Sequence, residues 1–160
     1  MQLQLEWNRP LLLKDGRSQN LIYCLDLNKL PHAAGIYILG RRWGRGAKAL
    51  FEALYVGKAT SVRGRVKSQL NNLRLMQHLK NAKAGKRILL VGRILLKPGQ
   101  RVEKSLLLAE RALIRYFLSE GHDLVNMQGT RLRRHEIVSS GKHPKRFIPG
   151  LIYLEKAKGG

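Results

Sequence analysis

Two short apolar segments, 35–39 and 54–58, have the pattern of neighbouring β-strands. Each contains a tyrosine and a glycine near one end, and their alternating, β-branched and aromatic residues are typical of strands. The segment between them, 40–53, is rich in glycine and arginine, so we interpret it as a loop. The two segments therefore predict a hairpin with Tyr37 and Tyr55 on the same surface.

The rest of the chain shows both strand and helix patterns. Residues 2–7 alternate polar and apolar side chains, which predicts a half-buried strand. Apolar residues at helical spacing predict one helix that begins after Thr60 or Ser61 and a second that ends near Gly85. A third strand of the sheet, a long helix and a C-terminal strand are expected over 87–96, 103–120 and 147–154.

These elements predict a single domain over 1–160 of the α/β (α+β) class. Its centre is expected to be a small, mainly antiparallel three-stranded sheet flanked by helices, with extra N- and C-terminal strands. A chain of 160 residues is long enough to bury a core of its own. The single cysteine, Cys24, has no partner for an internal disulfide and lacks the Cys/His neighbours of a zinc site.

The chain is strongly basic, with 31 Lys and Arg residues against 10 Asp and Glu and a formal net charge of +21. The segment 53–102 has twelve basic residues and no acidic one. A field of this strength favours a polyanionic partner, for which nucleic acid is the best fit. An anionic membrane surface and a scaffold role in a ribosome-like particle are the alternatives. The sequence has no apolar run of transmembrane length and no signal-peptide pattern, so we expect a cytoplasmic protein.

Glu110 lies in the middle of the apolar stripe of the segment 103–120. A carboxylate at such a position is costly unless it is paired, hydrogen-bonded or bound to a metal. A buried Glu–Arg pair and a metal-binding or catalytic role are both consistent with this pattern.

The glycine-rich stretch 40–48 lacks the Gly-Lys-Ser/Thr ending of a phosphate-binding loop. We interpret it as a flexible basic loop in which Trp43 stacks on a base or packs on the core. Candidate nucleic-acid-binding residues come from this loop, from the helix after the second tyrosine segment and from a C-terminal basic cluster. They are Arg41, Arg42, Trp43, Arg45, Arg63, Lys67, Arg131, Arg133 and Arg134.

Two motifs and their spacing resemble those of the GIY-YIG endonuclease superfamily. The first motif is Gly-Ile-Tyr at 35–37, and the second is Tyr-Val-Gly at 55–57, a variant with valine in the middle. An arginine follows ten residues after the second tyrosine, at Arg65, and a helical glutamate follows at Glu110. The resemblance covers residues 34–128, so the core is expected there, with an N-terminal extension over 1–33 and a basic C-terminal extension over 129–160.

This resemblance implies a metal-dependent endonuclease that hydrolyses DNA phosphodiester bonds with one Mg²⁺ or Mn²⁺. It implies that Tyr37 acts as the general base or orients the water, that Arg65 binds the non-bridging phosphate oxygens, and that Glu110 holds the metal. The catalytic set that it implies is Tyr37, Tyr55, Lys58, Arg65, Glu110 and Asn126.

Two features depart from the family pattern. The two tyrosines, Tyr37 and Tyr55, lie 18 residues apart, farther than in compact members, and Gln69 stands where many members have Tyr or His. Because glutamine cannot act as a base, one alternative is a catalytically silent, basic nucleic-acid-binding protein that keeps the fold. A basic component of a ribonucleoprotein is another, although it leaves the tyrosine pair unexplained. Substrate choice is expected to lie in the segment 40–53, the basic tail, an oligomer or a partner protein.

Overall fold

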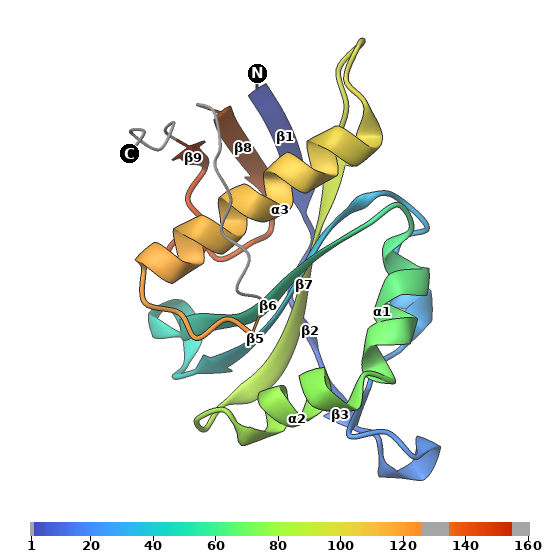
Figure 1. Ribbon diagram of the computed structural model, residues 1–160. Coiled ribbons are helices and arrows are strands. Elements are labelled where there is room, and N and C mark those ends of the chain that lie inside the picture. Colours follow the sequence, from blue (N-terminus) through green and yellow to red (C-terminus); the bar gives the residue numbers. More distant parts are fainter. Residues whose placement is uncertain (1, 126–134, 155–160) are drawn as a thin grey trace, which may run out of the picture.

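A mixed sheet of seven strands crosses the centre of the computed structural model, which describes residues 2–125 and 135–154 (Figure 1). The strand order is β6-β5-β7-β1-β8-β9, and a short β2 pairs with β7 beside this path. A separate two-stranded ribbon consists of β3 and β4. The strands are β1 (Gln2–Trp7), β2 (Leu11–Leu12), β3 (Lys14–Asp15), β4 (Tyr23–Cys24), β5 (Gly35–Trp43), β6 (Leu50–Ala59), β7 (Lys86–Leu95), β8 (His135–Gly141) and β9 (Leu151–Leu154).

The predicted α/β class is confirmed, but the prediction of a three-stranded central sheet is wrong. The N-terminal strand β1 lies inside the sheet, antiparallel to β7 and parallel to β8. Its alternating residues Leu3, Leu5 and Trp7 are almost completely buried. Gly92 of β7 leaves the space that the Trp7 ring fills, because a Cβ at this position would overlap the ring. The sequence alone places β1 at the periphery because its partner strands lie far away along the chain.

The two tyrosine strands form the predicted hairpin, which is longer than the sequence pattern indicates. β5 and β6 pair antiparallel along their length, so the interpretation of 40–53 as a loop is wrong. The connection is 44–49, and it contains the short 3₁₀ helix η3 (Gly46–Lys48). The strand accommodates Arg41 because Glu52 lies directly opposite on β6 and forms a salt bridge with it.

Helices cover both faces of the sheet (Figure 1). On one face, Leu113 and Phe117 of α3 share a core with Ile36 and Ile38 of β5. Successive side chains of a strand point to opposite faces, and Tyr37 accordingly lies in a second core with α1 and α2. The helices are α1 (Val62–Leu70), α2 (Leu73–Asn81) and α3 (Val102–Ser119).

Most predicted elements on either side of the hairpin are present, but β8 is not predicted, α2 ends at Asn81 rather than near Gly85, and β9 begins at Leu151 rather than at Phe147. Both short helices, the third strand β7, the long helix α3 and a final strand β9 are present. The chain leaves α3 through Gly121, whose φ of 82° lies in the left-handed region that favours glycine.

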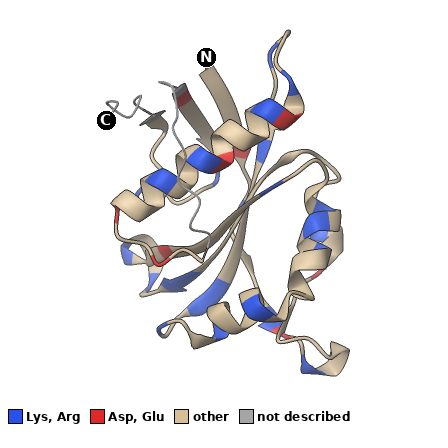
Figure 2. Cartoon of the chain, viewed as in Figure 1, with Lys and Arg blue, Asp and Glu red and all other residues tan. Residues whose placement is uncertain are grey.

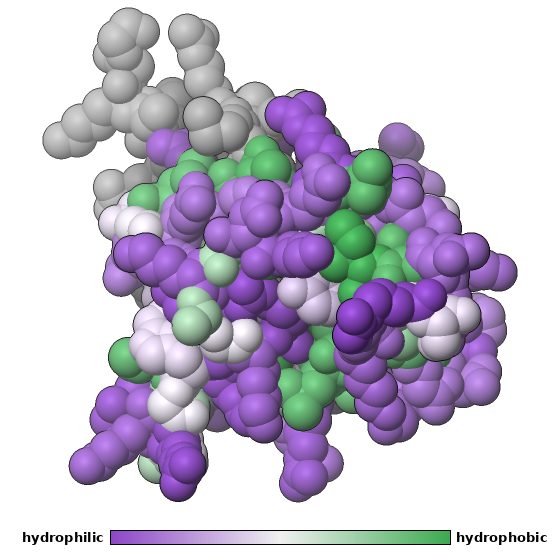
Figure 3. Space-filling model, turned by 90° about the horizontal axis from the view of Figure 1, so that it is seen from below, coloured by the Kyte–Doolittle hydropathy of each residue, from purple (hydrophilic) through white to green (hydrophobic). Residues whose placement is uncertain are grey.

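Positive charge is spread over the surface of this fold. Lys and Arg residues occur on all three helices and on the hairpin (Figure 2), and the end of the molecule that carries α2 is mostly hydrophilic (Figure 3). Within the described residues, no helix is long and apolar enough to cross a membrane.

Candidate active site

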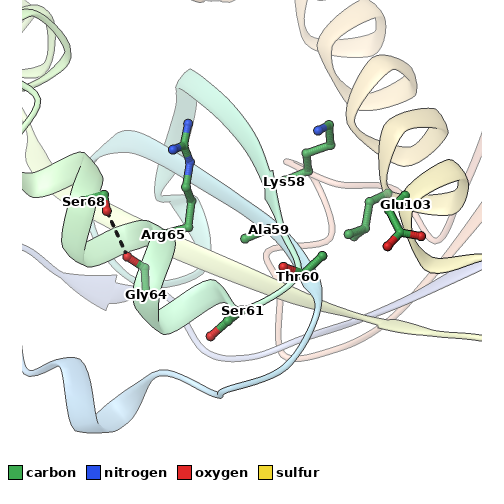
Figure 4. A pocket seen from close by; sticks show the side chains of 9 residues that line it. Lys58, Ala59, Thr60, Ser61, Gly64, Arg65, Ser68 and Glu103 are labelled. Atoms are coloured by element: carbon green, nitrogen blue, oxygen red, sulfur yellow. Dashed lines mark hydrogen bonds between the residues drawn. The ribbon is translucent and has the colours of Figure 1, made fainter.

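A cavity of about 490 Å³ lies at the β6 edge of the sheet, where β6 continues into α1 and faces the first turns of α3 (Figure 4). Lys58 of β6 and Arg65 of α1 are exposed beside it, and Glu103 stands on the α3 side. Two cations and several hydroxyl groups make this cavity suitable for an anionic ligand. The lining residues are Lys58, Ala59, Thr60, Ser61, Gly64, Arg65, Ser68, Glu103 and Leu106.

The two motif tyrosines lie together on the α1 face of the hairpin, as predicted. Their ring centroids are 6.0 Å apart. Tyr37 is completely buried, whereas Tyr55 is partly exposed. Gly57 lies directly opposite Tyr37 in the β5–β6 register, and a Cβ there would overlap the Tyr37 ring. The Tyr-x-Gly motif therefore has a steric reason, because its glycine makes room for the tyrosine of the first motif.

Gln69 joins the tyrosine pair from the last turn of α1. Its buried side-chain Nε2 donates to the hydroxyl of Tyr37 at 2.8 Å and to that of Tyr55 at 3.1 Å. Asn72 Nδ2 donates to Gln69 Oε1 at 3.2 Å. The sequence identifies Gln69 only as a departure from the family pattern. Its position four residues after Arg65, on the same side of the helix, is the signal that places it in the site.

Arg65 connects the tyrosine pair with the cavity. Hydrogen bonding with the Tyr37 hydroxyl, its charge interaction with Tyr37, and weaker interactions with Tyr55 raise the pKa of the Arg65 guanidinium, which therefore remains charged. Burial raises the pKa of Tyr37 well above its usual range, although hydrogen bonds from Gln69 and Arg65 oppose this rise. Tyr37 therefore holds its proton at neutral pH.

Glu110 lies on α3, half-buried, and its electrostatic environment links it to the cavity cations. Burial raises the pKa of the Glu110 carboxyl, while the charge and the backbone amide of Lys58 and the charges of Arg111 and Arg65 oppose the rise. Among the described residues, no salt bridge involves Glu110. The described residues therefore do not form the buried Glu–Arg pair that was one interpretation of the sequence pattern.

Glu110 offers one carboxylate, which is compatible with a cation that keeps water ligands. The described residues contain no group of three or more His, Cys, Asp or Glu side chains that could hold a metal. Mg²⁺ is commonly bound through one or two carboxylates together with waters and substrate phosphates. Glu110 meets that requirement, and Glu103, a second carboxylate on the same helix that the sequence analysis missed, lines the cavity.

The basic residues expected to bind nucleic acid differ in exposure and in whether their side chains are hydrogen-bonded within the fold. The buried Arg41 guanidinium donates to Glu52 at 2.8 Å and to the carbonyl of Ala84 at 2.9 Å, and it stacks 3.8 Å from the Trp43 ring centroid. Arg63 uses its guanidinium on the backbone carbonyl of Leu30, at 2.8 and 2.6 Å. Among the other candidates, Arg42 is half-buried, whereas Arg45 and Lys67 are exposed.

Four predicted site residues, Asn126, Arg131, Arg133 and Arg134, lie outside the described residues. The described chain before them ends at Val125, whose backbone N–H donates to the carbonyl of Leu54 at 2.9 Å, next to Tyr55 on β6.

Comparisons of the chain with protein-family models, with curated proteins and with solved structures find no match.

Proposed function

We propose that the protein is a metal-dependent endonuclease of the GIY-YIG type that hydrolyses phosphodiester bonds of DNA. The observation that carries this proposal is the position of Arg65. Its side chain lines the cavity, hydrogen-bonds to the tyrosine pair, and contributes to the electrostatic environment of Glu110. A structural arginine would have its donors used by carbonyl or carboxylate groups, whereas this one remains exposed beside Lys58.

In the proposed reaction, a water oxygen attacks the phosphorus and gives up a proton, the bond from phosphorus to the 3′-oxygen breaks, and the released 3′-oxygen takes up a proton from solvent. Arg65 binds the non-bridging oxygens through charge-assisted hydrogen bonds, and Lys58 adds a second positive charge. We assign the proton-accepting or water-orienting role to Tyr55 rather than to Tyr37. Tyr37 is completely buried and its pKa is raised by that burial, so it is poorly suited to act as a base.

Glu110 would hold the Mg²⁺ or Mn²⁺ ion. A divalent cation favours the charged carboxylate and so offsets the cost of burying it. Bound there, the ion supplies stabilisation of negative charge on the phosphate oxygens.

The exposed cations outside the cavity would hold the DNA backbone. Arg45 on the β5–β6 connection and Lys67 on α1 have side chains that a phosphate can reach. Such contacts release counterions, so the affinity is expected to fall steeply as the salt concentration rises.

The test is cleavage of supercoiled plasmid and single-stranded DNA by the purified protein, with Mg²⁺ or with EDTA. Glu110→Gln and Arg65→Ala are expected to remove cleavage. Glu120→Gln, at the exposed residue that caps the C-terminal end of the helix carrying Glu110, is the matched control and should keep cleavage. Cleavage that persists in EDTA and in both site variants would overturn the proposal.

A catalytically silent nucleic-acid-binding protein is the second candidate, and Gln69 is the observation that favours it. Its amide has no titratable proton and fills the space beside both tyrosine hydroxyls. This candidate predicts salt-dependent DNA binding by the wild-type protein without cleavage in either Mg²⁺ or Mn²⁺. Co-purification of RNA together with binding that resists high salt would instead favour a ribonucleoprotein component.

A further inference from the structure

A chain of hydrogen bonds leads from a backbone N–H to the tyrosine pair, and the N–H can only be a donor. The N–H of Leu75, in the first turn of α2, donates to Asn72 Oδ1 at 3.1 Å. A backbone N–H is always a donor, so the atom of the Asn72 side chain that faces it must be the oxygen. The other end of that amide, Nδ2, is then the donor to Gln69 Oε1.

The same reasoning fixes the direction of the Gln69 amide. Because Gln69 Oε1 accepts from Asn72, its Nε2 is the end that faces the two tyrosines. An amide nitrogen donates and does not accept. Both phenol oxygens are therefore acceptors from Gln69, at 2.8 Å for Tyr37 and 3.1 Å for Tyr55.

Arg65 is a second donor to the oxygen of the buried Tyr37. The guanidinium is a donor without an acceptor, and it also hydrogen-bonds to the Tyr37 hydroxyl. With two donors on its oxygen, Tyr37 makes its contact with Tyr55 through its own O–H. The oxygen of Tyr55 then accepts from Gln69 and Tyr37, and Arg65, which can only donate, also hydrogen-bonds to it. The Tyr55 hydrogen therefore points away from the pair, on its partly exposed side.

We propose that Gln69 is a positioning residue for the tyrosine pair, held in one orientation by Asn72, and that it makes Tyr55 the outward-facing member whose oxygen is surrounded by donors. This inference rests on the proposed function for its catalytic consequence. The Tyr55 O–H, directed toward the exposed side, can donate to a water or a phosphate oxygen there. Gln69 thus helps Tyr55 to orient the attacking water although it has no titratable proton itself.

The most informative variant is Asn72→Asp. It replaces only the Asn72 Nδ2 atom, the donor to Gln69, with an oxygen, and it does not alter Gln69 or either tyrosine. Aspartate keeps the acceptor that caps α2, but its carboxylate repels Gln69 Oε1. The Gln69 amide is expected to turn over and present its oxygen to the tyrosines, which then must donate to it. Asn71→Asp is the matched control, because Asn71 is exposed and its amide donates to the carbonyl of Lys67 instead.

Two measurements on folded protein decide the proposal. The first is the hydrogen-bond state of each tyrosine hydroxyl at neutral pH, followed by the ¹³Cζ chemical shift of ring-labelled tyrosine and assigned with Tyr55→Phe, which needs no catalysis. We expect Asn72→Asp and Gln69→Met to move the Tyr55 signal, because the donor from Gln69 is lost, and Asn71→Asp to leave it unchanged. The second is cleavage, where we expect kcat to fall by about tenfold to a hundredfold with little change in KM.

The outcomes separate the two proposals. If Asn72→Asp and Gln69→Met both keep the Tyr55 chemical shift and the kcat of the Asn71→Asp control, the positioning role of Gln69 is overturned. If the wild-type protein cuts no DNA, the proposed function fails, and the NMR measurement by itself decides whether Gln69 directs the hydrogen bonds of the pair.

Discussion

Arg65 and Arg87 have the same side chain in opposite surroundings. Arg87, on β7, is buried and donates to four backbone carbonyls at the end of α2. They belong to Leu79 at 2.6 Å, Gly85 at 2.9 Å, Ala82 at 3.0 Å and Lys83 at 3.1 Å. Arg65 is exposed, lines the cavity and meets the hydroxyls of two tyrosines.

The contrast indicates that the basic side chains of this chain have two roles. The guanidinium of Arg87, like those of Arg41 and Arg63, donates hydrogen bonds to groups of the fold, because buried carbonyl oxygens without partners destabilise a protein. Arg65 and Lys58 keep donors that face a cavity, where an anionic ligand can accept them. The positive residues relevant to function are therefore those that line the cavity or lie on the surface, rather than those whose guanidinium is bonded to the backbone or to a carboxylate of the fold.

The largest expected effect is on activity at Arg65. Arg65→Ala should lower the cleavage rate by about a hundredfold to a thousandfold, because it removes the donors aimed at the charge that develops on the phosphate. Its free energy of unfolding should change by less than about 1 kcal/mol, since the side chain is exposed. Cleavage kinetics at saturating DNA and urea unfolding measure the two quantities. A variant with wild-type kinetics would remove Arg65 from the site.

Arg87 should show the reverse behaviour. Arg87→Met keeps a long apolar side chain but leaves the carbonyls at the end of α2 without their donor, so we expect the free energy of unfolding to drop by about 3 kcal/mol. Urea unfolding measures this drop. DNA affinity, measured where the variant is still folded, should match wild type. A stable variant with weakened DNA binding would break the distinction between the two arginines.

A smaller effect is expected on the salt dependence of DNA affinity, which should distinguish exposed cations from those bonded within the fold. Lys67→Ala and Arg45→Ala should each reduce the slope of log affinity against log salt concentration by about one, as expected for loss of one phosphate contact. Arg63→Ala should leave that slope unchanged and lower the melting temperature, since its guanidinium holds the carbonyl of Leu30. Fluorescence anisotropy with labelled DNA at several salt concentrations gives the slopes, and equal slopes for all three variants would contradict this assignment.

The smallest expected effect is on the pH dependence of stability through Glu110, whose carboxyl interacts with the charges of Lys58 and Arg65. Because burial raises the pKa of Glu110, the folded state holds a proton that the unfolded state has already lost at pH values above the ordinary glutamate range. Stability is therefore lost as the pH rises from that range through the raised value. Glu110→Gln should unfold at a higher urea concentration than wild type at pH 7, and the difference should shrink at acid pH. Glu120→Gln serves as the control, and a variant less stable than wild type at pH 7 would contradict the prediction.

Much of the local structure could be predicted because it depends on side-chain periodicity. The alternation of apolar residues predicts the tyrosine hairpin, and the helical stripe predicts α3 with Glu110 on it. The spacing from Tyr55 to Arg65 covers one strand end and the first turn of a helix, so their proximity also follows from local geometry. The interpretation of 40–53 as a loop failed because its arginines looked solvated, whereas Arg41 pairs across the strands with Glu52.

Periodicity, composition and charge thus determined by themselves the class of the fold, the hairpin and helices, and the tyrosines that lie side by side. The folded structure was needed to show that β1 lies between β7 and β8, that Gln69 joins both tyrosine hydroxyls, and that Arg41, Arg63 and Arg87 are bonded within the fold. The physical reason is distance along the chain. A period of two or of 3.6 residues is present in any short segment, but a hydrogen-bond partner such as Ser139 for the Trp7 indole, 132 residues away, exists only after the chain has folded.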